Sequence, residues 1–96
     1  MENKMTCQTI QDLVNQGAKI IDVRSVDEFA AGNIKNSVNI PLSTFESIAN
    51  HVSKDEQVLL YCRSGSRSEM AKNYLNANGY NATNIGGINQ FIGCLS

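Results

Sequence analysis

The sequence predicts a single α/β domain over residues 1–96, with a central parallel sheet of about five strands and helices on both faces. Short apolar segments alternate with amphipathic ones along the chain, which is typical of strands joined by helices. A length of 96 residues suits one hydrophobic core. A hydrophobic fraction of 42% beside 18% charged residues is ordinary for a folded globular domain.

Two helices flank a strand in the first third of the chain. Thr6 is suited to cap a helix that has its apolar residues on one face and ends near Gly17. The apolar segment 20–23 predicts a buried strand. Ser25 and Glu28 have the spacing of a capping box, so a short helix is expected to begin after Ser25.

The middle of the chain repeats this alternation. Residues 37–40 predict a second strand, which Pro41 would end because proline lacks a backbone N–H group. Ser43 and Glu46 again have capping-box spacing and predict a further helix. Residues 57–61 form an apolar run that predicts the central strand of the sheet.

The last third is expected to add a helix, a strand and a short terminal helix. The helix is predicted over residues 67–78 and should end at Gly79. Four of its residues are expected to face the core: Met70, Ala71, Tyr74 and Leu75. Residues 82–85 predict the last strand, and the glycines at 86–87 would turn the chain into a helix that contains Phe91.

The most informative stretch is residues 58–68, where the apolar strand stops at Cys62 and a helix follows shortly after. Ligands of parallel sheets bind beyond the carboxyl ends of the strands, and Cys62 lies at such an end. A thiol in front of a helix N-terminus has a lowered pKa, because the positive end of the helix dipole favours the thiolate. The pattern therefore predicts a nucleophilic cysteine.

The loop after Cys62 is small, basic and rich in hydroxyl groups. Its backbone can curl and aim successive N–H groups at one point because three residues are small: Ser64, Gly65 and Ser66. Arg63 and Arg67 add positive charge, and the hydroxyl of Ser68 can cap the helix or bond a thiolate or a bound oxyanion. We therefore expect Cys62 to be catalytic and the six residues after it to bind an anionic substrate.

Composition excludes several classes of partner. The formal net charge of −1 argues against nucleic acid or an anionic membrane as the main partner. No run is long and apolar enough to span a membrane, and the polar start does not resemble a secretory signal. Cytoplasmic localisation is expected, or periplasmic if a leader peptide has been removed. The three cysteines Cys7, Cys62 and Cys94 are far apart and form no CxxC pair, so neither a metal site nor a disulfide scaffold is expected.

Several short motifs resemble the rhodanese-like, single-domain sulfurtransferases, and among these the small bacterial thiosulfate sulfurtransferases of the phage-shock type. The matching segments cover about residues 6–91: Ile21-Asp22-Val23-Arg24, Glu28-Phe29, Gly32-Asn33-Ile34, Asn39-Ile40-Pro41, residues 62–68, Gly79-Tyr80 and Gly86-Gly87-Ile88. The chain departs from the family at two positions, since the family often has histidine where Asn33 stands and tryptophan where Phe91 stands. Neither departure lies in the cysteine loop.

The resemblance implies a two-step sulfur transfer. Cys62 would attack the sulfane sulfur of a donor such as thiosulfate and expel sulfite. The resulting persulfide would pass its outer sulfur to cyanide or to a thiol, which a partner sulfur-carrier protein could supply. No metal or organic cofactor is implied. Asp22, Arg24 and Glu28 are expected to brace the loops around the site and not to react themselves.

Other functions remain open from the residues. The domain could be a catalytically idle binding module, although such modules typically lose the cysteine. It could be a cysteine phosphatase or arsenate reductase, but the phosphatases of this fold carry five residues between cysteine and arginine, and here four separate Cys62 from Arg67. A redox role, in which Cys7 or Cys94 resolves Cys62, and a structural pairing of Arg67 with a glutamate are further alternatives.

Overall fold

A four-stranded parallel sheet forms the centre of the computed structural model, which describes residues 6–94. The strand order is β2-β1-β3-β4, and the bounds are β1 Lys19–Asp22, β2 Ser37–Asn39, β3 Gln57–Cys62 and β4 Asn81–Gly87. The predicted parallel sheet is confirmed, with four strands in the described part of the chain in place of about five. The four apolar segments of the sequence account for all of them, because the remaining described segments are helices and loops.

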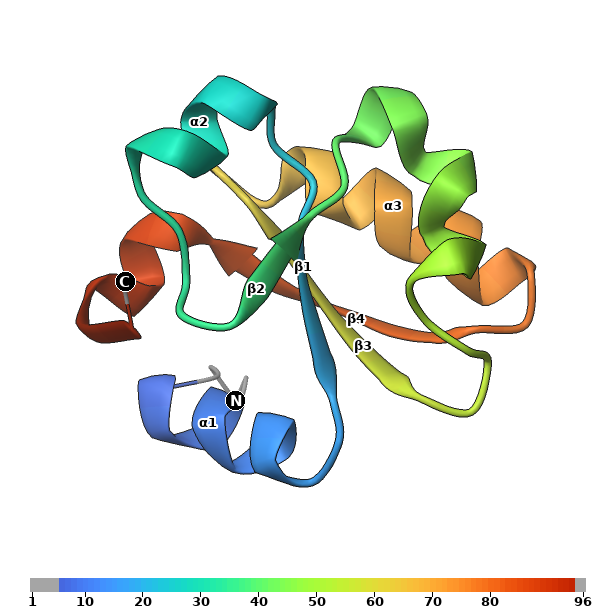
Figure 1. Ribbon diagram of the computed structural model, residues 1–96, viewed down its shortest axis with the longest axis horizontal. Helices are drawn as coiled ribbons and strands as arrows, with labels where there is room; N and C mark the ends of the chain where they lie inside the picture. Colours follow the sequence, from blue (N-terminus) through green and yellow to red (C-terminus); the bar gives the residue numbers. More distant parts are fainter. Residues whose placement is uncertain (1–5, 95–96) are drawn as a thin grey trace.

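Five helical segments connect and flank the strands (Figure 1). Three are α-helices, α1 Cys7–Asn15, α2 Val26–Ala31 and α3 Ser66–Ala77, and two are 3-10 helices, η1 Leu42–Asn50 and η2 Ile88–Cys94. Thr6 caps α1 by accepting a hydrogen bond from the backbone of Thr9. The capping box of Ser25 and Glu28 opens α2 as predicted.

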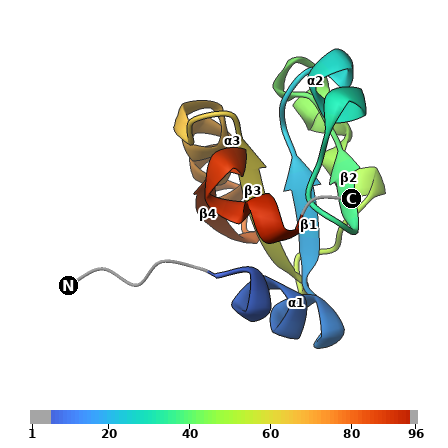
Figure 2. The ribbon, with the colours of Figure 1, turned by 90° about the vertical axis from the view of Figure 1, so that its left-hand side faces the viewer.

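Helices cover both faces of the sheet, as predicted. Val58, Leu60 and Cys62 of β3 belong to one buried cluster, which also contains residues of α3 and η1. Leu59 and Tyr61 of the same strand belong to a second cluster, which contains residues of α1 and η2. Successive side chains of a strand point to opposite faces, so the two clusters lie on the two sides of the sheet. Helices α1 and α2 lie at opposite ends of the sheet in both views (Figures 1 and 2).

The buried face of α3 differs from the prediction. Ser68, Ala71 and Leu75 are buried, whereas Met70 and Tyr74 are 62% and 47% exposed. The spacing of three and four residues between the buried positions defines one helical face, and it includes a serine because the first turn of α3 packs on the polar loop. Met70 and Tyr74 therefore lie beside the core.

The capping box predicted at Ser43 does not form. Pro41 is the N-cap of η1, without a side-chain cap, and the helix is of the 3-10 type with a kink at Thr44, where φ is −120° and ψ is 28°. Because the helix begins at Leu42, directly after the proline, Ser43 lies inside the first turn and cannot cap it. The predicted apolar residue Phe45 is nevertheless buried.

Tyr61 anchors the end of β3 just before Cys62. Its hydroxyl accepts a hydrogen bond from the backbone of Ile34 at 3.0 Å and lies 2.9 Å from the hydroxyl of Ser37. Burial raises the pKa of Tyr61 to about 12, so the phenol stays protonated. The side chain thus ties the central strand to the segment that leads into β2, and this limits movement of the neighbouring cysteine.

Candidate active site

Cys62 lies at the carboxyl end of β3, paired in the sheet with Gly87 of β4, and its residue surface is fully buried. Its thiol is free. The chain turns back after the cysteine, so that the backbone N–H group of Gly65 donates a hydrogen bond to the Cys62 sulfur at 2.9 Å. Gly65 has a φ of +100°, which glycine adopts without the steric cost that a Cβ atom would add.

Opposing effects act on the Cys62 thiol, and their sum lowers its pKa. Burial raises the pKa, because it disfavours the charged thiolate. Hydrogen bonds from the side chain and the backbone of Ser68 lower it, as do those from the backbone of Gly65 and Ser64. The site therefore favours a thiolate through hydrogen-bond donors placed around the sulfur.

Ser68 is the predicted site residue that lies deepest beside the sulfur. It is fully buried in the first turn of α3, and its hydroxyl oxygen lies 3.4 Å from the Cys62 sulfur. The same oxygen lies 3.1 Å from the carbonyl oxygen of Gly65 and 2.7 Å from the side-chain oxygen of Asn84. A hydroxyl carries one hydrogen, so these three contacts are alternative uses of a single donor.

The loop packs directly on the end of β4. A Cβ atom at Gly87 would lie 2.5 Å from the carbonyl oxygen of Arg63 and 3.2 Å from the Cα atom of Ser64. Glycine is therefore needed at this position for the loop backbone to approach the strand. Gly87 belongs to one of the segments that match the family motifs, and the close approach of the loop explains why a glycine is needed there.

The two loop arginines differ in their surroundings. Arg67 forms a bidentate ion pair with Glu28 of α2, with nitrogen-to-oxygen distances of 2.9 and 3.1 Å. The pairing with a glutamate that the sequence left open is therefore present. Arg63 is exposed and forms no ion pair within the described residues. Ser64 and Ser66 are exposed as well, with their hydroxyl oxygens 3.3 Å apart.

Hydrogen bonding to Arg67 holds the pKa of Glu28 at about 2, and the backbone N–H of Ser25 adds to this effect. Glu28 consequently has two roles, since the same carboxylate closes the capping box of α2 and pairs with α3. The pair connects the segment after β1 to the segment after β3. Arg67 also lines a hollow of about 230 Å³, together with Val23 and Pro41.

Asp22 and Arg24 form a buried ion pair at the end of β1. The guanidinium of Arg24 contacts both carboxylate oxygens of Asp22, at distances of 2.7 to 3.0 Å, and donates to the carbonyl of Gly32 at 2.6 Å. It also lies over the ring of Tyr61, with 5.7 Å from the guanidinium carbon to the ring centroid. The pair therefore joins β1 to the end of α2 and touches the residue before Cys62, without contacting the sulfur.

Asn84 is a site residue that sequence reasoning missed. Its side-chain nitrogen donates to the carbonyl of Gly65 and to the carboxylate of Glu69, both at 3.0 Å. Its oxygen accepts from the hydroxyl of Ser68 at 2.7 Å and from the backbone of Gly86 at 2.9 Å. The signal available in the sequence was an asparagine inside a strand, two residues before a glycine pair, and this did not distinguish it from a surface residue.

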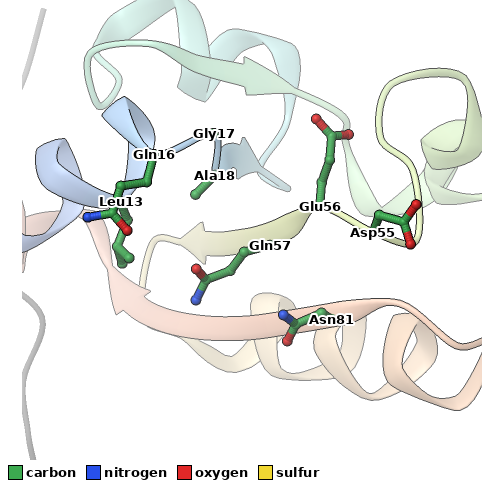
Figure 3. Close-up of a pocket in the computed structure, with 8 residues that line it drawn as sticks. All are labelled: Leu13, Gln16, Gly17, Ala18, Asp55, Glu56, Gln57 and Asn81. Carbon is green, nitrogen blue, oxygen red and sulfur yellow. The ribbon is translucent and has the colours of Figure 1, made fainter.

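A larger hollow lies at the other end of the sheet from Cys62, where β3 and β4 begin (Figure 3). It has a volume of about 460 Å³ and includes Gln16 and Gly17 from the end of α1, Gln57 at the start of β3 and Asn81 at the start of β4. Gln57 and Cys62 are the first and last residues of the six-residue strand β3, so they lie roughly 16 Å apart. The hollow in Figure 3 is thus remote from the thiol.

Within the part of the chain that the structure describes, no three histidine, cysteine, aspartate or glutamate side chains are grouped to hold a metal ion. No helix among the described residues is long and apolar enough to cross a membrane. Cys7 is disulfide-bonded, which the sequence did not predict, while Cys62 keeps its free thiol. The side chain of Cys94 lies outside the described residues.

The parallel sheet, with a cysteine loop at the carboxyl end of its central strand, defines an α/β domain built around a buried, activated thiol. Residues 6–94 match the Rhodanese-like domain family, and the chain belongs to this family. The motifs of the sequence predicted a rhodanese-like domain, and this prediction is confirmed. Asn33 and Phe91 are compatible with the fold, since Asn33 donates to the carbonyl of Phe29 and Phe91 is buried.

Relatives with names that describe sulfur chemistry are among the similar proteins. The chain is 33% identical over 66 residues, 69% of its length, to the provisionally named sulfur carrier protein YrkF of Bacillus subtilis. It is 36% identical over 61 residues, 64% of its length, to a sulfurtransferase of Allochromatium vinosum. These matches cover 36% and 57% of the two relatives, so the chain spans less than two thirds of their length. Among solved structures, a rhodanese with anions from Escherichia coli has a TM-score of 0.75 and 33% identity, over 79% of this chain and 93% of that one.

Proposed function

We propose that this protein is a sulfurtransferase that carries sulfur as a persulfide on Cys62. The buried sulfur, which accepts a hydrogen bond from Gly65 and lies within reach of Ser68, is the observation that carries the proposal. Hydrogen-bond donors that surround a thiolate can also stabilise the negative charge of a persulfide, which lies on its outer sulfur. No cofactor is required for this chemistry.

The transfer divides into two displacements at sulfur. The Cys62 thiolate attacks the outer sulfur of thiosulfate, a new sulfur–sulfur bond forms, and sulfite leaves with the electron pair of the broken bond. A thiolate or cyanide then attacks the outer sulfur of the persulfide, and the Cys62 thiolate is released as the leaving group. Each step exchanges one nucleophile for another, so no oxidant or reductant is consumed.

The surroundings of the loop support a small anionic donor. Arg63 is exposed beside the loop and places positive charge where an oxyanion could approach. Arg67 lies on the other side, and its charge is shared with Glu28. We propose that Arg63 and Arg67 attract the donor and that residues 64–66 and 68 supply the hydrogen-bond donors around the sulfur.

A thiol of a partner sulfur-carrier protein is proposed as the cellular acceptor, with cyanide as a laboratory substitute. The name of the Bacillus subtilis relative, which describes a sulfur carrier, supports this choice. Asp22, Arg24 and Glu28 are proposed to support the site, since their contacts are with neighbouring loops. We further propose that the protein acts in the cytoplasm, where the free thiol of Cys62 would stay reduced. The disulfide at Cys7 would instead fit the periplasmic alternative.

A phosphatase role is less well supported by the same geometry. Four residues separate Cys62 from Arg67, and the guanidinium of Arg67 is engaged with Glu28 and not directed into the loop. A binding module without activity would not need the hydrogen-bond donors that lower the thiol pKa. These observations favour sulfur transfer over both alternatives.

Intact-mass measurement tests the proposal directly. Thiosulfate should add one sulfur atom to the protein, and cyanide should remove it with formation of thiocyanate. The Cys62→Ser variant should show no adduct and no turnover, since an alcohol cannot carry the sulfur. An unchanged rate in this variant, or no adduct on the unmodified protein with thiosulfate or a low-molecular-weight persulfide, would contradict the function.

A further inference from the structure

Asn84 of β4 lies at the centre of a hydrogen-bond network behind the cysteine loop. Its amide makes four contacts, of which two use the nitrogen and two use the oxygen. The nitrogen faces two acceptors, the carbonyl of Gly65 and the carboxylate of Glu69, whereas the oxygen faces the backbone N–H of Gly86. If the nitrogen and oxygen were exchanged, the nitrogen would face the N–H group of Gly86 and the oxygen would face two other oxygens. The network therefore fixes the orientation of the amide.

Both groups that Asn84 contacts in the loop also reach the Cys62 sulfur. Gly65 donates its N–H group to the sulfur at 2.9 Å and accepts from Asn84 through its carbonyl. The Ser68 hydroxyl lies 3.4 Å from the sulfur and 2.7 Å from the Asn84 oxygen. One amide therefore fixes the two nearest hydrogen-bond donors without touching the sulfur itself.

The geometry points to Asn84 as a positioning residue that keeps the hydroxyl of Ser68 and the peptide of Gly65 in hydrogen-bonding reach of the Cys62 sulfur. The Asn84 oxygen gives the buried hydroxyl a second acceptor when the sulfur carries no charge. When the sulfur is a thiolate or a persulfide anion, the charge-assisted hydrogen bond is the stronger one and the hydroxyl hydrogen turns toward it. The Asn84 oxygen and the Gly65 carbonyl then face the hydroxyl oxygen without a hydrogen between them, so they compete with the sulfur for this donor. Asn84 supports the thiolate through the hydrogen bond from its side-chain nitrogen to Gly65.

The register of the sheet explains how an asparagine of β4 reaches the loop. Leu60 pairs with Asn84, but the next residue, Tyr61, pairs with Gly86, so β4 contains one extra residue, Ile85. Asn84 itself precedes the bulge and keeps the regular register, so it lies on the face of Leu60, which packs against α3. Ile85 is buried in the core while Asn84 faces the first turn of α3.

The role rests on the proposed function of Cys62 as the sulfur carrier, but its test is a titration that needs no turnover. The rate of Cys62 alkylation by iodoacetamide is measured against pH, which gives the pKa of the thiol. Asn84→Ala should raise this pKa by about one unit, which corresponds to the loss of one hydrogen bond to a charged group. Near neutral pH, alkylation and persulfide formation should both slow several-fold.

Asn76→Ala is the matched control, because Asn76 also joins α3 to β4. Its side chain makes two hydrogen bonds to the backbone of Ala82, at 2.8 and 3.1 Å, near the start of the strand. It has no contact with the loop among the described residues. If Asn84 merely fastened the helix to the strand, both variants would change the thiol equally, whereas we expect Asn76→Ala to leave the titration unchanged.

A double-mutant cycle with Ser68→Ala tests whether Asn84 acts through the serine. Asn84→Ala should raise the thiol pKa more in the Ser68→Ala background than in the unmodified protein, since the competition of Asn84 for the serine hydroxyl is then absent and only the route through Gly65 remains. Neither substitution replaces a charged residue of β1, α2, the loop or α3, although Asn84→Ala also removes a hydrogen bond to Glu69. The charged residues nearest the loop are Asp22, Arg24, Asp27, Glu28, Arg63, Arg67, Glu69 and Lys72. Thermal melting of each variant shows whether it is folded before it is titrated.

If Asn84→Ala does not fold, Asn84→Asp takes its place, because it keeps the shape of the side chain. Its carboxylate removes the donor to Gly65 and adds negative charge, so the thiol pKa should rise by more than about one unit. An unchanged or lowered pKa in the folded variant, an equal shift in Asn76→Ala, or full additivity in the cycle would overturn the role of Asn84. A raised thiol pKa in the protein without substitutions would instead count against the proposed function.

Discussion

The cysteine loop is attached to the domain on two sides by different kinds of contact. On the β4 side the contacts are neutral and close, namely the Asn84 network and the approach of the loop backbone to Gly87. On the α2 side the contact is one charged pair, Arg67 with Glu28, whose side chains are 36% and 29% exposed. The contacts on the β4 side therefore hold the loop backbone close to the strand. The ion pair on the α2 side contributes an attraction that salt and pH can weaken.

The largest effect is expected from crowding the β4 side with Gly87→Ala. The added methyl group would lie 2.5 Å from the carbonyl oxygen of Arg63, so the loop must move away from the strand. We expect the free energy of unfolding to fall by roughly 1–3 kcal/mol, as for other overpacked sites. The rate of persulfide formation from thiosulfate should fall by at least tenfold, because the donors around the sulfur shift with the loop.

Gly17→Ala is the control for this substitution. Gly17 has a φ of +107°, and a Cβ atom there meets no heavy atom within 4 Å. Its substitution should cost roughly 1 kcal/mol of backbone strain and leave the rate of persulfide formation unchanged. Equal rates for Gly87→Ala and Gly17→Ala would show that the close approach to β4 does not control the loop.

An intermediate effect is expected from removing the loop arginines one at a time. Arg63→Ala should raise the KM for thiosulfate about fivefold at low salt, which is the weight of one Coulomb interaction near a surface. Its melting temperature should not change, since Arg63 makes no ion pair in the described part of the structure. Arg67→Ala should also lower the melting temperature, because it leaves the Glu28 carboxylate unpaired.

Steady-state kinetics at two ionic strengths, with melting curves for each variant, separate these contributions. The reverse pattern, in which Arg63→Ala destabilises the fold and Arg67→Ala affects only the KM for thiosulfate, would invert the roles given to the two residues. It would also mean that only Arg67, on the α2 side, attracts thiosulfate.

The smallest effect is expected from the acid titration of the α2 side. Glu28 has a pKa of about 2 in the folded protein, below its ordinary value of 4.5. A lowered pKa means that the pair stabilises the fold fully above about pH 4.5 and loses this contribution as the pH falls toward 2. Glu28→Gln keeps the capping geometry and should remove about 0.5 kcal/mol at neutral pH, and its difference from the unmodified protein should shrink as the pH falls toward 2.

Melting temperatures between pH 2.5 and pH 7 measure this dependence. Glu46→Gln changes an exposed carboxylate outside the pair and serves as the control. A constant difference in melting temperature between Glu28→Gln and the unmodified protein over the whole range would show that the charge of Glu28 contributes nothing.

Much of the architecture followed from local patterns. The strand segments, the caps at Thr6 and Ser25, and the loop beginning at Cys62 each depend on residues close together in the chain. The inward face of α3 was harder to predict, because apolar character favoured Met70 over Ser68. The serine is buried for a reason that lies elsewhere in the chain, namely the polar loop and strand β4.

The contacts of Asn84 and the pairing of Arg67 show the same limit. Each joins segments that are 16 to 39 residues apart. Asn84 lies opposite Leu60 on the face of the sheet that packs against α3, and this register is set by the packing of the whole sheet. The sequence left open which glutamate pairs with Arg67, and the position of α2 determines that Glu28 is its partner.

The bulge in β4 places a constraint on insertions and deletions. Since side chains alternate between the two faces of a sheet, losing one residue between Asn81 and Gly87 would turn either the asparagine or the buried isoleucine to the wrong face. Many substitutions in this strand keep that alternation, but a change in length does not. The fold should therefore tolerate a change in the number of residues in β4 less well than most substitutions in it. The exceptions are Gly87 and Asn84, which contact the loop.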